Sequence, residues 1–224
     1  MNKSLRARAP LTDEDLAKLT ADELVRLKLT AEEKLRLKEL SKTREKERIE
    51  RSVRLRVEEE LMLTDLRAIG LSLESVWDLV NTSNKYRQAI PVLIKHLQLP
   101  YSDSTREGIA RSLAVTEPEA RKAWPILVDQ YRRSPTGWGT KAPGDVREYR
   151  LSAKDGLACA LSVAVSNETL PELVALAKDR SHGESRVLLL SALRKSDTPL
   201  AKQALTELAT DPELEREIAS WQKR

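Results

Sequence analysis

The chain is poor in several residue types, with one cysteine, no phenylalanine, seven glycines and 4% aromatic residues among 224 positions. A single cysteine excludes an intramolecular disulfide and is typical of a reducing compartment. So few glycines disfavour a turn-rich all-β fold. Because aromatic residues are scarce, a core must come mainly from Leu, Ala, Val and Ile, which suits thin, repeated layers of helices.

Long apolar runs are also missing. No run of about 18 apolar residues occurs, so we expect neither a transmembrane helix nor a membrane partner. Residues 1–6 include basic positions, but no apolar segment follows them, so we do not expect a signal peptide. A cytoplasmic protein is the resulting expectation. The net charge is +4, from 39 basic and 35 acidic residues. Nucleic-acid-binding domains usually concentrate positive charge more strongly.

What the chain does contain is a ten-residue phrase that occurs twice. Residues 106–115 (REGIARSLAV) return 48 positions later as residues 154–163 (KDGLACALSV). Both copies have two charged residues, Gly, a branched apolar residue, Ala and then a Leu. A looser third copy, residues 186–193 (RVLLLSAL), keeps a basic residue seven positions before its last Leu. Self-similarity at a period of a few tens of residues is typical of stacked helical repeats.

Each repeat is predicted to be a pair of helices. Pro91, Pro125 and Pro171 are predicted near the start of the first helices, in the first turn, where proline is tolerated. For Pro91 and Pro125 the alternative is a position one turn later, where proline would kink the helix. A fourth unit begins near Pro199. In the second helices the apolar residues are three and four positions apart, the spacing of one helical face; they are Ile109, Leu113, Leu157, Leu161, Leu189 and Leu193.

Glycine recurs within the second helices, at Gly108 and Gly156. A glycine inside a helix costs about 1 kcal/mol relative to alanine. Its occurrence twice at one repeat position favours close packing of neighbouring helices, against the alternative of chance in a tolerant helix.

The turns between paired helices resemble those of the HEAT-repeat family. In that family an Asp lies in the turn within a repeat and a basic residue opens the second helix, as Asp103 and Arg106 do here, and as Asp179 and Arg186 do further along. Residues 75–97 also resemble the opening of bacterial HEAT-like proteins that lack an assigned activity.

The resemblance covers residues 66–224 and implies an all-α, right-handed α-solenoid of HEAT-like helical repeats. Residues 1–65 would precede it as a charged helical extension. Solenoids of this kind bind through extended surfaces, so the resemblance implies a protein-interaction scaffold or adaptor and does not name the partner.

The N-terminal extension carries three capping boxes, in which a Thr and an acid three residues later cap a helix start. They are Thr12 with Asp15, Thr20 with Glu23, and Thr30 with Glu33. We expect two short helices and a longer one from about Ala31. The segment has too little apolar surface to fold alone, so it either docks on another surface or stays mobile.

A basic stretch follows at residues 42–56, with seven basic and three acidic residues. Three interpretations stay open: a solvated helix with Glu–Arg pairs, an amphipathic helix that docks on a protein, and a helix that binds nucleic acid. The apolar residues Ile49, Val53, Val57 and Leu61 share one face of this helix. Under the nucleic-acid interpretation the binding residues would be Arg44, Arg48, Arg51 and Arg54.

An insertion at residues 134–144 interrupts the second repeat, and its three glycines and two prolines predict a loop. Trp138 lies between two of the glycines, either as an anchor for a partner or folded over the loop's own edge. We predict that this region binds a partner through Trp138, Arg132, Arg133, Lys141, Arg147, Tyr149 and Arg150.

No catalytic set stands out. We expect His96 to end a helix, His182 to support a turn, and Cys159 to be an ordinary small residue on a helix side. Asp103 and Asp179 are expected to cap helices or pair with basic residues. We therefore predict a non-enzymatic protein without a metal or other cofactor. A protein-interaction scaffold, in toxin immunity or complex assembly, is our first hypothesis, and a nucleic-acid-binding protein is the alternative.

Overall fold

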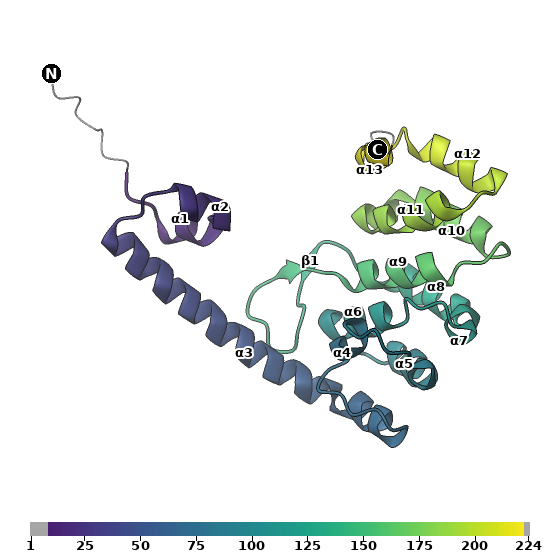
Figure 1. Ribbon diagram of the computed structural model, residues 1–224, viewed down its shortest axis with the longest axis horizontal. Coiled ribbons are helices and arrows are strands. Elements are labelled where there is room, and N and C mark those ends of the chain that lie inside the picture. Colours follow the sequence, from purple (N-terminus) through teal and green to yellow (C-terminus); the bar gives the residue numbers. More distant parts are fainter. Residues whose placement is uncertain (1–8, 222–224) are drawn as a thin grey trace. The chain divides into compact units, whose positions relative to one another are not determined.

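The structure, a computed structural model, describes residues 9–221. It is mostly helical and holds one small two-stranded sheet (Figure 1), so the prediction of an all-α chain is confirmed. The chain divides into two compact units, Met1–Val53 and Arg54–Arg224, each described below by itself. The division falls inside helix α3 (Ala31–Ala68), on the N-terminal side of the boundary expected between residues 65 and 66.

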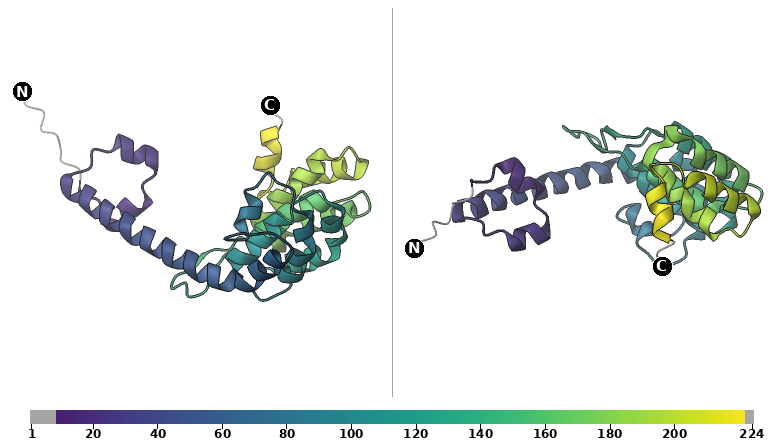
Figure 2. Two further views of the ribbon diagram at one scale, coloured as in Figure 1. Left: turned by 60° about the horizontal axis from the view of Figure 1, so that its bottom comes forward. Right: turned by 90° about the horizontal axis from the view of Figure 1, so that it is seen from above.

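The first unit contains α1 (Asp13–Lys18), α2 (Ala21–Arg26) and the first part of α3. All three predicted capping boxes form: the Thr12, Thr20 and Thr30 hydroxyls accept from the backbone N–H three residues later, and the acid at that position accepts from the Thr backbone. The segment before α1 is held to α3, because Glu33 accepts from the backbone N–H of Leu11 at 2.9 Å and Arg36 donates to the Leu11 carbonyl at 2.9 Å. Figure 2 shows α1 and α2 beside this part of α3.

The second unit consists of helix pairs that follow one another along the chain (Figure 1). Its elements are α4 (Trp77–Val80), η1 (Arg87–Ala89), α5 (Ile90–Leu97), α6 (Asp103–Ser112), α7 (Pro118–Lys122), α8 (Trp124–Arg133), β1 (Trp138–Gly139), β2 (Tyr149–Arg150), α9 (Ala153–Ala164), α10 (Leu170–Lys178), η2 (Arg180–Ser185), α11 (Arg186–Lys195), α12 (Pro199–Leu208) and α13 (Glu215–Trp221). Pro91, Pro125 and Pro171 lie in the first turns of α5, α8 and α10. The first-turn interpretation of these prolines is therefore confirmed.

The helices that carry the repeated phrase lie side by side, α6 against α9 and α9 against α11. The six apolar residues predicted to form their shared face, Ile109, Leu113, Leu157, Leu161, Leu189 and Leu193, are all fully buried. Each such side chain stabilises the fold by about 1.5–3 kcal/mol through the removal of apolar surface from water. The repeat in the sequence is thus the repeated core position of three stacked helices.

The close packing predicted from the two glycines is confirmed. A Cβ added to Gly156 on α9 would lie 2.9 Å from the backbone oxygen of Glu107 on α6, and one added to Gly108 would lie 2.5 Å from a methyl group of Val76. Real Cβ atoms do not approach other heavy atoms so closely. The α6–α9 contact therefore requires the absence of a side chain at position 156.

Asp103 joins the same two helices. Its carboxylate accepts from the backbone N–H groups of Ser152, at 2.8 Å, and Ala153, at 3.0 Å, where α9 begins. These N–H groups have no partner within the helix. Asp103 is thus a helix cap as predicted, but for the helix of the following repeat. Asp179 caps its own turn by accepting from the N–H of Ser181 at 2.9 Å.

The insertion departs from the prediction of a plain loop. Trp138 pairs with Arg150 and Gly139 with Tyr149 in an antiparallel two-stranded sheet, and no further strand joins it within residues 9–221. The pairing satisfies backbone groups that a loop would leave to water. The sequence signal for this strand pair was Trp138 between two glycines with the aromatic Tyr149 downstream. The many glycines and prolines between the two residues favoured the prediction of a loop instead.

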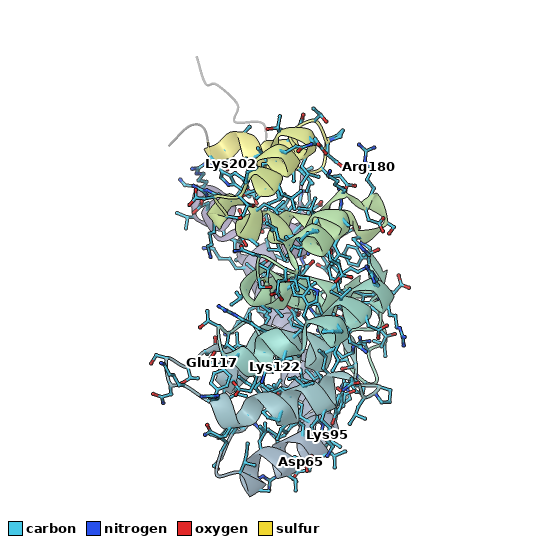
Figure 3. All side chains as sticks on the ribbon, turned by 90° about the vertical axis from the view of Figure 1, so that its right-hand side faces the viewer. Asp65, Lys95, Glu117, Lys122, Arg180 and Lys202 are labelled. Atoms are coloured by element: carbon cyan, nitrogen blue, oxygen red, sulfur yellow. The ribbon has the colours of Figure 1, made fainter. Side chains whose placement is uncertain are left out.

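We predict that Gly156→Ala lowers the free energy of unfolding by about 1–3 kcal/mol, the usual cost of overpacking. An unconstrained helical Gly→Ala change would instead stabilise the protein by about 1 kcal/mol. Thermal and urea unfolding measure the difference. Lys202→Ala, at an exposed position of α12 (Figure 3), is the matched control and should stay within about 0.5 kcal/mol of the parent. A Gly156→Ala variant more stable than the parent would contradict the close approach.

We also predict that deletion of residues 1–40 leaves the cooperative thermal transition of the second unit in place. The physical reason is that the core residues of that unit lie within residues 62–218, outside the deleted segment. Circular dichroism at 222 nm during heating measures the transition. Loss of cooperative unfolding in the truncated chain would show that the N-terminal helices are an integral part of the fold.

Candidate protein-interaction site

The segment between α8 and α9, residues 134–151, forms a hairpin that is fixed to the rest of the second unit. The Leu151 N–H donates to the Gly137 carbonyl at 2.9 Å and closes its base. The Lys141 carbonyl accepts from the N–H of Ser104 at 2.9 Å, at the start of α6. Arg54 of α3 donates to the Pro143 carbonyl and lies 3.3 Å from a carboxylate oxygen of Asp145. These contacts make the hairpin an ordered projection.

Two apolar side chains of the hairpin remain in solvent: Trp138 is 69% exposed and Val146 is 99% exposed. Trp138 borders a depression of about 270 Å³ that Arg150, Lys154 and Glu184 also line. Most of the indole lies in water, which weighs against the alternative in which it folds over the edge of its own loop. A large exposed aromatic on an ordered hairpin is a favourable anchor for a protein partner.

The basic residues predicted around Trp138 are mostly paired with acids. Arg132 contacts Glu172 at 3.0 Å, Arg133 contacts Asp129 at 2.8 Å, Lys141 contacts Glu107 at 3.3 Å, and Arg150 contacts Asp155 at 3.4 Å and Glu184 at 2.7 Å. Arg147 instead donates to the Tyr149 hydroxyl at 2.8 Å and lies over its ring. Positive and negative charges therefore alternate on this surface.

The arginines proposed for nucleic acid are divided between the two units. Arg44, Arg48 and Arg51 lie on the part of α3 that belongs to the first unit, where Arg48 makes two hydrogen bonds to Glu45, at 2.8 and 2.7 Å. Arg54 belongs to the second unit and holds the hairpin. Its guanidinium is therefore engaged within the protein.

A series of buried or half-buried basic residues links successive repeats, and sequence reasoning did not find these contacts. Arg106, Lys154 and Arg186 occupy one position of the repeated phrase, and each reaches a group in the unit that follows. Arg106 donates to Gln130 at 2.7 Å, Lys154 lies 3.2 Å from Nδ1 of His182, and Arg186 donates to Asp211 at 3.0 Å. The recurrence of a basic residue at the start of each second helix was the available signal.

In the central contact of this series the lysine meets an imidazole, and the nearest acid, Asp179, lies 3.6 Å from the other ring nitrogen of His182. Lys154 and His182 are both buried, and the lysine ammonium lies 5.3 Å from the centre of the Tyr131 ring. Burial lowers the pKa of Lys154, and burial together with the nearby Lys154 charge lowers the pKa of His182. Burial also raises the pKa of Tyr131 to about 12. By contrast, the Arg186 hydrogen bond lowers the pKa of Asp211 to about 2.

The remaining candidates for chemistry have structural partners. His96 lies in the last turn of α5, as predicted, between Asp65 at 2.9 Å and the Tyr101 hydroxyl at 2.8 Å. Figure 3 shows Asp65 near Lys95, which contacts it at 2.8 Å. Cys159 lies on the side of α9, and burial raises the pKa of its thiol.

Within residues 9–221, no three or more His, Cys, Asp or Glu side chains gather in a way that could hold a metal ion. None of the helices described there is both long and apolar enough to cross a membrane.

Comparison with known proteins found no match: no family model, curated protein or solved structure is significantly similar to the chain.

The buried His182 predicts a pH dependence of stability. The folded state lowers the pKa of His182 below its ordinary value of 6.5. As the pH falls below that value, His182 binds a proton in the unfolded chain but not in the folded chain. The free energy of unfolding therefore decreases until the pH reaches the lowered pKa. We expect the melting temperature of the parent to fall between about pH 7 and pH 5, with a smaller fall for His182→Gln.

Differential scanning calorimetry across this range is the measurement. The comparison concerns the slope against pH, because His182→Gln also changes the contact with Lys154 and shifts stability at every pH. Equal slopes in the two proteins would show that His182 takes up its proton equally well in the folded and unfolded states.

Proposed function

We propose that this chain is a non-enzymatic scaffold or adaptor that binds a protein partner. In this proposal residues 66–224 form a right-handed α-solenoid of HEAT-like repeats in a cytoplasmic protein. The partner binds through the concave face of the solenoid, through residues 134–150 and through the N-terminal helices. Toxin immunity and assembly of a complex are both roles that such a protein performs.

The observation that carries the proposal is the surface of the hairpin. Trp138 and Val146 expose apolar area on an ordered projection, while the neighbouring basic side chains are neutralised by acids. A protein surface with interspersed charges and its own apolar groups complements such a site. A polyphosphate backbone needs unpaired cations along its path.

Nucleic-acid binding through Arg44, Arg48, Arg51 and Arg54 is the alternative. The cluster of basic residues on α3 favours it. The pair between Arg48 and Glu45 and the engagement of Arg54 with Pro143 and Asp145 count against it. Binding to generic duplex and single-stranded DNA and RNA at two salt concentrations distinguishes the two functions, because phosphate contacts weaken by orders of magnitude as salt rises.

The direct test of the proposal is co-purification of the tagged protein from its native host, with and without nuclease, followed by mass spectrometry. We expect a protein partner whose recovery does not depend on nucleic acid. Recovery that nuclease abolishes, together with salt-sensitive binding lost in an Arg48→Ala, Arg51→Ala, Arg54→Ala variant, would establish the alternative.

We predict that Trp138→Ala weakens binding of that partner by about 2 kcal/mol or more, the range of interface hot spots. The melting temperature of the Trp138→Ala variant should stay near that of the parent, since the indole is 69% exposed. Trp124→Ala is the contrasting control: Trp124 is buried and donates to Glu172 at 2.8 Å, so that variant should lose about 3–5 kcal/mol of stability. A lower melting temperature for Trp138→Ala without a loss of binding would assign the residue a purely structural role.

A further inference from the structure

A second surface of this unit lies where the repeated helices end, away from the hairpin. Side chains of α9, α11 and α13 line a depression of about 700 Å³ with mostly apolar walls. Cys159 and Val163 come from α9, Leu188 from α11 and Trp221 from α13, and all four are only half-buried. We name it the α9–α11 groove.

Two further depressions border the groove. It shares Ala114 with a neighbouring depression of about 400 Å³ that Tyr86 also lines. It shares Val163 and Lys195 with another of about 710 Å³ beside Ser162. The two neighbouring depressions also share Thr116, so the three adjoin one another and together offer more room than a compact ligand needs, which suits a segment of polypeptide chain.

The charge of the groove differs from that of the hairpin. Arg194 and Lys195, in the last turn of α11, line the groove and are exposed, and neither pairs with an acid among residues 9–221. The Arg194 guanidinium lies 4.9 Å from the centre of the Trp221 ring, and Trp221 donates to Glu217 at 3.0 Å. Glu217 also lines the groove, so two cations and one acid, which accepts from Trp221, lie beside the half-buried apolar side chains and leave an excess of positive charge.

We propose that the α9–α11 groove binds an acidic amphipathic helix of a partner protein. Its apolar side packs on Val163, Leu188 and Trp221, and its Asp or Glu side chains pair with Arg194 and Lys195. Amphipathic helices bind grooves of this kind through apolar residues on one face, and complementary charges select the partner. This inference rests on the proposed function, because it names the chemistry of a protein partner for a surface of the second unit.

The test is a selection of random peptides of about 16 residues, long enough for about four helical turns, on the immobilised full chain. The Ser191→Trp variant serves for counter-selection, since Ser191 is exposed on α11 and lines the groove, where an indole would fill it. We expect the enriched peptides to combine Leu or aromatic residues at helical spacing with an excess of Asp and Glu. Enriched peptides without that excess, or no enrichment over the counter-selection, would overturn the proposal.

Two measurements on the enriched peptides complete the test. Arg194→Glu with Lys195→Glu should weaken binding about tenfold or more, whereas Lys202→Glu, on α12 outside the groove, should leave it unchanged. The Arg194→Gln, Lys195→Gln variant removes the same two positive charges without adding negative ones, so it has less effect on folding. Because Cys159 is the sole cysteine and lines the groove, the peptides should also slow its reaction with maleimide several-fold. Equal peptide affinity in the parent and in the Arg194 and Lys195 variants, or an unchanged rate of Cys159 labelling, would overturn the proposal.

Dodecanoate tests whether an anionic amphiphile, and not a peptide, occupies the groove. Protection of Cys159 by dodecanoate below its micellar concentration, with no acidic peptide enriched, would assign the groove to an anionic amphiphile instead. The two proposals can fail separately. If a host protein co-purifies equally with the parent and with the Arg194→Glu, Lys195→Glu variant, the scaffold proposal stands and the groove proposal is wrong.

Discussion

The backbone of α9 approaches α6 at Gly156 so closely that a single methyl group would meet the Glu107 carbonyl oxygen at 2.9 Å. Asp103 of α6 caps the start of α9, and Glu107 contacts both Lys141 and Ser152. Because the hairpin runs between α8 and α9, these contacts fix its C-terminal end and its middle. The position of Trp138 therefore depends on the absence of a side chain at a glycine on a different element.

The same helices are joined by a series of buried or half-buried basic residues whose contacts differ chemically. Arg186 has carboxylates in Asp211 and Glu213, and Arg106 has the neutral groups of Gln130 and Ser134. Lys154 has an imidazole and a phenol ring. A buried cation without an acid is costly, and the lowered pKa values of Lys154 and His182 are the physical expression of that cost. The stability of the middle of the stack is thus linked to the protonation of His182.

In our proposals the two binding surfaces contribute different kinds of interaction. On the hairpin the charges are already satisfied within the protein, so that surface contributes apolar contact through Trp138 and Val146. In the α9–α11 groove, Arg194 and Lys195 leave positive charge available beside an apolar floor. A partner that used both surfaces would gain affinity from the first and charge selection from the second, since exposed charges affect association and selectivity more than affinity.

The sequence by itself determined the all-helical class, the three capping boxes, the buried face of the repeated helices and the close approach at the two glycines. Each follows from local spacing, because helix caps and apolar periodicity act within a few residues. Only the tertiary structure decided that Asp103 caps the next repeat and that Arg54 holds the hairpin. It also decided that most cations beside Trp138 pair with acids, whereas Arg194 and Lys195 pair with no acid among residues 9–221. Apart from the local pairs of Arg133 and Asp155, those contacts join side chains 34 to 91 positions apart, and a single sequence carries no record of such distances.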